Sequence, residues 1–142
     1  MKKAKGFMSF LLVCALFAAT SVPALARASS QIDAYYMDVT PTGNGEIAIM
    51  FSVTGNGMMD RLGAESIRIF ERGTYGWELA DTIDEDEPNM VKTNSPKYGN
   101  TVYFQGVSGE QYQIIVTIFA EDENGDSDSR SKTFTVRSEE RR

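Results

Sequence analysis

The chain has 142 residues, of which 14 are Lys or Arg and 20 are Asp or Glu, so its formal charge is -6. It contains no histidine and a single cysteine, which excludes Ser-His and Cys-His catalytic pairs and zinc sites with imidazole ligands. The acidic balance argues against nucleic-acid binding, because the phosphate backbone requires a basic surface.

Residues 1–28 are typical of a secretory signal peptide. Three lysines among the first five residues precede an uncharged segment, 6–26, whose centre is apolar. Small residues at the required spacing permit cleavage after Ala26 or after Ala28. An uncleaved membrane anchor is the alternative, since a segment of this length almost spans a bilayer. We expect cleavage, a secreted extracellular product and no transmembrane segment after cleavage.

Cleavage would change the chemistry of the product. Cys14 lies inside the apolar segment, so the mature chain would have no thiol and no disulfide. All 20 acidic residues but only 10 of the 14 basic ones lie beyond residue 28, so the mature chain would be more acidic than the whole. Residues 29–142 have the length of one domain.

Short runs of alternating apolar and polar residues, separated by Gly, Asn, Asp and Pro clusters, predict an all-β domain over residues 29–137. The clearest runs are 46–54, where only Met50 interrupts the polar face, and 112–120. Seven short antiparallel strands predict a β-sandwich. A polar loop is expected at 84–100 and a frayed, charged tail at 138–142. The expected strands are 32–39, 46–54, 66–71, 77–83, 101–105, 112–120 and 132–136.

The entry to the strand at 112–120 has a recognisable order of residues. Val107, Gly109 and Tyr112 precede alternating Ile and Val residues. With the strand at 132–136, this segment resembles the end of a fibronectin type III domain, an immunoglobulin-like β-sandwich. The resemblance implies that Tyr112 forms a corner by hydrogen-bonding to nearby backbone. Two features depart from the family: its second-strand Trp is absent, with Phe51 nearby, and the strand after Tyr112 is longer.

The chain also resembles small secreted bacterial proteins of unknown function that consist of a signal peptide and one such domain. This resemblance implies a location and a fold, and no activity, because such sandwiches serve many roles.

Two acidic loops are candidate cation sites. In the fibronectin type III order they lie at the same end of the domain, where a bound cation would relieve the repulsion between carboxylates. The second loop alternates oxygen side chains as a calcium loop does, although Ser127 and Thr133 replace the Gly and the acid of that motif. The alternative is a pair of solvated turns whose charge serves solubility. The candidate ligands are Asp84 and Asp86 in the first loop and Asp122, Asn124, Asp126 and Asp128 in the second.

An apolar strip is the second candidate site. If the alternate residues of 112–120 face the core, Ile115 and Phe119 face outward, next to Phe70 of the neighbouring strand. An exposed strip of this kind marks a partner or self-association surface. The alternative is that other residues cover the strip, or that these residues are present only as good β-formers.

The remaining candidates are aromatic or catalytic. Trp77, with Tyr75 and Tyr98, could stack on sugars, although an aromatic residue beside a tight turn commonly packs over its own hairpin. Paired carboxylates can hydrolyse glycosides, but here they lie in polar loops where nothing raises a pKa, so we expect no enzyme. The expected function is a secreted, non-enzymatic binding module for an unknown cell-envelope or extracellular protein or glycan. The alternatives are a calcium-stabilised structural or accessory domain and a carbohydrate-binding module.

Overall fold

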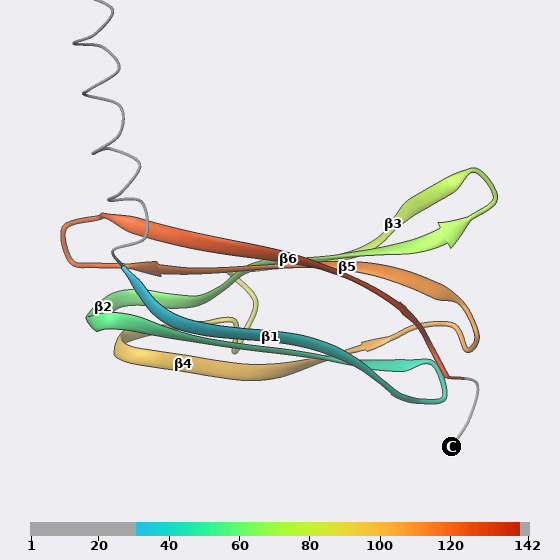
Figure 1. Cartoon of the computed structure of the whole chain (residues 1–142), viewed down its shortest axis with the longest axis horizontal. Helices are drawn as coiled ribbons and strands as arrows, with labels where there is room; N and C mark the ends of the chain where they lie inside the picture. Colours follow the sequence, from blue (N-terminus) through green and yellow to red (C-terminus); the bar gives the residue numbers. More distant parts are fainter. Residues whose placement is uncertain (1–30, 140–142) are drawn as a thin grey trace, which may run out of the picture. The chain divides into compact units, whose positions relative to one another are not determined.

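A computed structural model describes residues 31–139, which form an antiparallel, all-strand body (Figure 1). The predicted signal peptide and residues 140–142 lie outside the described residues. No helix among residues 31–139 has the length and apolar character needed to cross a membrane. The strands are β1 (Ile32–Gly43), β2 (Glu46–Gly73), β3 (Gly76–Asp84), β4 (Val91–Gln105), β5 (Gln111–Glu121) and β6 (Ser127–Arg137).

The structure has six strands rather than the predicted seven, because the expected strands at 46–54 and 66–71 both belong to β2. The turn signal at 55–57 does not end the strand. Residues 59–63 of β2 pair with residues 91–95 of β4, so the extended chain continues to make hydrogen bonds past the glycines. For the same reason, the predicted loop at 84–100 is strand from Val91 onward.

β2 belongs to two sets of pairings. Its first half pairs with β1 and β4, and its second half pairs with β3 and β5; β6 then pairs with β5. Figure 1 shows β1 and β4 in one layer and β3, β5 and β6 in another, with β2 passing between them. The arrangement is compatible with a β-sandwich, in which a strand can change sheets at an irregular point.

The core lies on the predicted apolar faces. Side chains at alternate positions of β2 and β5 point inward and are buried, as their spacing predicts. Partly buried side chains from β4 and β6, including Val102 and Phe134, pack against them. The central buried residues are Ile47, Ile49, Phe51, Val53, Ile67, Ile69, Tyr112, Ile114, Val116 and Ile118.

Tyr112 forms the predicted hydrogen bond to nearby backbone. The Val107 N–H donates to the Tyr112 hydroxyl at 2.7 Å, and this hydroxyl donates to Glu71 Oε1 at 2.7 Å. The Tyr112 ring also packs edge-on against Phe104, with 5.4 Å between ring centroids. Burial, followed by the hydrogen bond to Glu71, raises the pKa of Tyr112 to about 12.

The chain remains anchored beyond the predicted domain boundary at residue 137. The buried Ser138 hydroxyl donates to the Val107 carbonyl oxygen at 2.6 Å, and the Ser138 N–H donates to the Glu110 carbonyl oxygen at 2.9 Å. The Gly45 N–H donates to the Glu139 carbonyl oxygen at 2.8 Å. The first two residues of the predicted tail are therefore held against the strands and are not frayed.

Candidate functional site

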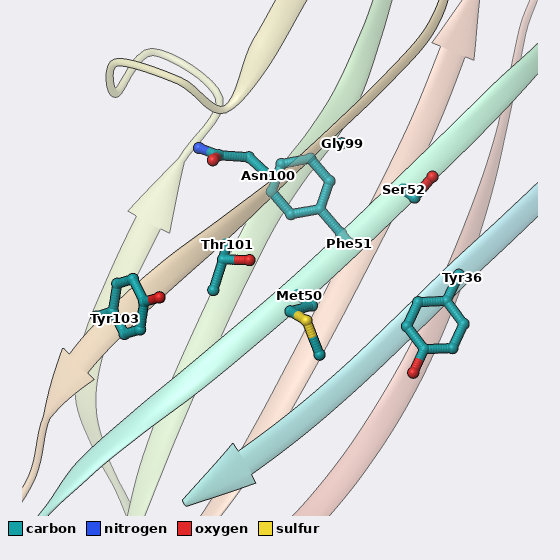
Figure 2. A pocket seen from close by; sticks show the side chains of 8 residues that line it. All are labelled: Tyr36, Met50, Phe51, Ser52, Gly99, Asn100, Thr101 and Tyr103. Atoms are coloured by element: carbon teal, nitrogen blue, oxygen red, sulfur yellow. The ribbon is translucent and has the colours of Figure 1, made fainter. Parts of the chain in front are cut away.

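The outer surface of the layer that contains β1 and β4 carries a shallow pocket of about 560 Å³ (Figure 2). Two of its lining residues are exposed tyrosines: Tyr36 is 55% exposed and Tyr103 is 60% exposed. In Figure 2, Met50 lies between the two rings. The lining residues are Tyr36, Met50, Phe51, Ser52, Gly99, Asn100, Thr101 and Tyr103.

The strand register explains why these residues gather. Tyr36 of β1 pairs with Ser52 of β2, and Tyr103 of β4 pairs with Ala48 of β2. Met50 lies midway between Ala48 and Ser52 along β2. Tyr36, Met50 and Tyr103 therefore follow a diagonal across β1, β2 and β4. Diagonal neighbours in a sheet have Cα atoms about 7–8 Å apart, so the two tyrosines are separated by roughly twice that distance.

A glycine keeps this surface hollow. Gly99 pairs with Ser52, and a Cβ atom at Gly99 would stand 2.9 Å from the Phe51 carbonyl oxygen and 3.2 Å from the Ser52 Cβ atom. No side chain therefore covers the half-buried Ser52 from the side of β4. Ser52, level with Tyr36, and Thr101, level with Met50, contribute hydroxyl groups to the same surface. We call the surface formed by Tyr36, Met50, Ser52, Gly99, Thr101 and Tyr103 the tyrosine face.

A second pocket adjoins the first. It is lined by Ser52, Gly99, Tyr98, Lys92 and Lys97, and it shares Ser52 and Gly99 with the tyrosine face. Lys92 and Lys97 are both exposed.

These lysines differ from the other cationic side chains of residues 31–139. Each of the others makes an ion pair, a hydrogen bond or a ring contact, whereas the side chains of Lys92 and Lys97 make none. The tyrosine face thus has two available cations at one end.

The two acidic segments approach one another at Arg61. Arg61 makes ion pairs with Glu85 of the first loop at 3.2 Å and with Glu121, beside the second, at 3.6 Å. A cation from the chain itself therefore joins the two acidic segments.

The predicted calcium ligands do not converge. Asp122 Oδ1 accepts hydrogen bonds from the N–H groups of Asn124 at 2.9 Å and Asp126 at 3.0 Å. The buried Asp128 pairs with Arg130 at 2.8 Å, and its Oδ2 has no hydrogen-bond partner. Among the residues the structure describes, no three Asp, Glu, His or Cys side chains are grouped so as to hold a metal ion. The remaining candidates, Asp84, Asp86, Asn124 and Asp126, are exposed.

The predicted apolar strip is only partly exposed. Phe119 is 6% exposed, and the Arg61 guanidinium lies over its ring at 5.1 Å. Phe70 and Ile115 are half-buried on the same outward face, and Arg68 lies 5.2 Å from the Phe70 ring centroid. Arginines therefore contact both aromatic rings of the predicted strip.

The predicted sugar-stacking residues are dispersed. Arg72 lies 5.5 Å from the ring centroid of the half-buried Trp77. Tyr98 packs against the core residue Phe51 at 6.0 Å, and its hydroxyl donates to the Asn89 carbonyl oxygen at 2.8 Å. Tyr75, at the turn between β2 and β3, is 99% exposed.

Sequence reasoning missed the tyrosine face. Its one local signal is Met50, a large apolar residue on the face of the run at 46–54 that otherwise carries polar residues and Ala48. The register that places Tyr36 and Tyr103 on either side of Met50 joins residues distant in sequence, so local spacing does not reveal it. No protein-family model matches the chain, and no curated protein matches it.

Proposed function

We propose that this chain is a secreted, non-enzymatic binding module whose contact surface is the tyrosine face. The observation that carries the proposal is the pair of exposed rings, Tyr36 and Tyr103, on the two strands that flank β2, with hydroxyl groups on the same surface. Tyrosines supply rigid, amphipathic contact area at low cost in conformational entropy. Strands hold such side chains more precisely than loops do.

The scaffold we propose is a fibronectin type III-like sandwich. Two observations support it. The pairings divide into one group of β1, β2 and β4 and another of β3, β2, β5 and β6, so β2 serves as two successive strands. Tyr112 makes the backbone hydrogen bond typical of a tyrosine corner. Sandwiches of this class present binding surfaces on many unrelated proteins, so the scaffold alone names no ligand.

Binding tests should compare two sets of tyrosines. Protein purified after expression of the full chain would be applied to immobilised envelope glycans, extracellular glycans and extracellular proteins. We expect a ligand bound by the unaltered protein to lose at least about tenfold in affinity with Tyr36→Ser/Tyr103→Ser. The matched control is Tyr75→Ser, which removes a tyrosine that is 99% exposed but distant in the fold.

Both variants should keep the unfolding temperature of the unaltered protein, since their changes lie on the surface. Equal binding by the double variant and the control would show that the contact surface lies elsewhere.

A further inference from the structure

We propose that the ligand of the tyrosine face is an acidic glycan. Its sugar rings would stack on Tyr36 and Tyr103, and the carboxylate of a uronic acid residue would bind between Lys92 and Lys97. This inference rests on the proposed function and names the ligand class of the same surface.

The shape of the surface favours a chain of sugar rings. The pocket is shallow and open, and it extends along a diagonal from Tyr103 through Met50 to Tyr36. An exposed tyrosine ring offers a flat apolar face to the C–H groups of a sugar. The hydroxyls of Ser52 and Thr101, which line the same pocket, can donate and accept hydrogen bonds with sugar hydroxyls.

The charge of the surface favours an acidic ligand. Lys92 and Lys97 line the pocket that continues the tyrosine face, and their side chains contact no acid in the described residues. On a chain with a formal charge of -6, two unpaired lysines beside a pocket provide a local attraction for an anion. A lysine ammonium group binds a carboxylate as a point charge with three donors.

The carboxylates on the same face lie away from the lysines. Asp38 pairs with Met50 in the strand register, and Glu46 pairs with Gln105, next to Tyr103. Glu46 therefore lies toward the Tyr103 end and Asp38 lies level with Met50 at the centre, whereas Lys97 pairs with Thr54 beyond Gly99. A glycan with a carboxylate at one end would therefore bind in a single orientation, with that carboxylate next to the lysines.

Other polymers fit the surface less well. A nucleic acid carries a phosphate at every nucleotide and needs many cations, whereas this site offers two beside a strongly acidic protein. An extended peptide that adds to a sheet needs a free strand edge. The tyrosine face is centred on β2, which pairs on both sides with β1 and β4, so a ligand that contacts both rings lies across these strands rather than along the outer edge of β1 or β4.

The test is calorimetric titration with three otherwise neutral hexasaccharides that each end in a single uronic acid residue: galacturonate, mannuronate or glucuronate. Each would be compared with its carboxyl-reduced, neutral form. We expect at least one uronate to bind, and carboxyl reduction or Lys92→Gln/Lys97→Gln to weaken that binding at least about tenfold. Added salt should weaken binding to the unaltered protein but have little effect on the lysine variant. Lys132→Gln is the matched control, because Lys132 contacts Phe134 on β6.

Each contrary outcome has a separate meaning. Equal binding of a neutral form would overturn the acidic assignment but leave the proposed binding function intact. Tighter binding of oligothymidylate or polyglutamate, lost in Tyr36→Ser/Tyr103→Ser, would replace the glycan with a nucleic acid or a peptide. Failure of all three uronates to bind would also overturn the glycan assignment. The proposed function itself fails only if no ligand depends on Tyr36 and Tyr103.

Discussion

The hydroxyl of Tyr112 joins two parts of the chain that are 41 residues apart, Glu71 on β2 and the start of β5. It also accepts the Val107 N–H, so it satisfies a backbone donor in the turn before β5. A Cβ atom at Gly106 would stand 2.8 Å from the Tyr112 ring, so the chain passes this ring closely at a residue without a side chain. The local order of residues predicted the corner, but only the fold identifies Glu71.

We expect the free energy of unfolding to fall at alkaline pH because of Tyr112. Its pKa is about 12 in the folded chain and about 10 when unfolded. The unfolded chain therefore loses this proton first. The stabilisation is complete below about pH 10 and is lost as the pH rises to about 12, for a total of roughly 2–3 kcal/mol.

Urea unfolding of the unaltered protein and of Tyr112→Phe across this pH range measures the effect. The variant should be less stable near neutral pH by about 1–3 kcal/mol, since the Val107 N–H loses its acceptor. Its stability should also fall less steeply with pH. If the free energy of unfolding fell equally with pH in the two proteins, Tyr112 would not be the cause of the loss of stability at alkaline pH.

Phe119 shows why some residue-level predictions differ from the structure. The alternation in the run at 112–120 correctly places Phe119 on the outward face of β5. Phe119 is nevertheless buried, and Arg61, which is distant in sequence, packs over its ring. Spacing within one strand therefore predicts the face of a residue but not what covers it.

At the scale of elements, β2 determines the architecture. It extends over 28 residues and pairs with four other strands. Gly63 lies where β2 is flanked by both Val91 of β4 and Phe119 of β5. Its φ is +148°, and a Cβ atom there would overlap the Met90 carbonyl oxygen and stand 2.9 Å from the Val91 Cα atom.

Gly63→Ala should lower the free energy of unfolding by about 3 kcal/mol, from overlap with backbone and from an unfavourable φ. The matched control is Gly57→Ala, whose φ is +100° with no atom within 4 Å of the added Cβ. This control should cost only about 1 kcal/mol, because only the backbone conformation is unfavourable. Urea unfolding of both variants separates the two causes, and equal losses would contradict the close approach at Gly63.

The alternating runs predicted the all-β class and most of the strands, because burial on one face imposes a period of two. They failed at residues 55–57, where the glycines indicated a turn. Long-range pairing with β4 keeps the chain extended beyond them, and this pairing is absent from the local sequence.

At the scale of the whole molecule, Arg61 connects two acidic segments that are distant in the sequence. Arg61 pairs with Glu85 and Glu121, and its side chain is 35% exposed. Arg61→Gln should lower the free energy of unfolding by about 1 kcal/mol at low salt, because the remaining carboxylates repel one another. This loss should shrink in about 0.5 M salt, where screening is strong.

Arg72→Gln is the control for Arg61→Gln, since Arg72 contacts the Trp77 ring and none of the described ion pairs includes it. Its effect should be small and nearly independent of salt. A loss at Arg61 that is equally independent of salt would mean that contact with the Phe119 ring, rather than charge, is the source of the stabilisation.

The site was harder to predict than the fold. The tyrosine face combines residues from three strands, and the sequence indicates only Met50 as an unusual residue. The acidic loops were the clearest candidates in the sequence, but several of their carboxylates make internal contacts. Asp122 accepts hydrogen bonds within its own loop, and Glu121 and Asp128 form ion pairs.

The most direct test of the tyrosine face as the binding surface is a map of backbone amide chemical shifts on addition of the uronate-ended hexasaccharide that binds best. The account predicts that the largest changes occur at Tyr36, at 50–52 and at 97–103. They should be absent from the hairpin at 66–84. Changes concentrated in that hairpin, or on the acidic loops, would contradict the central claim.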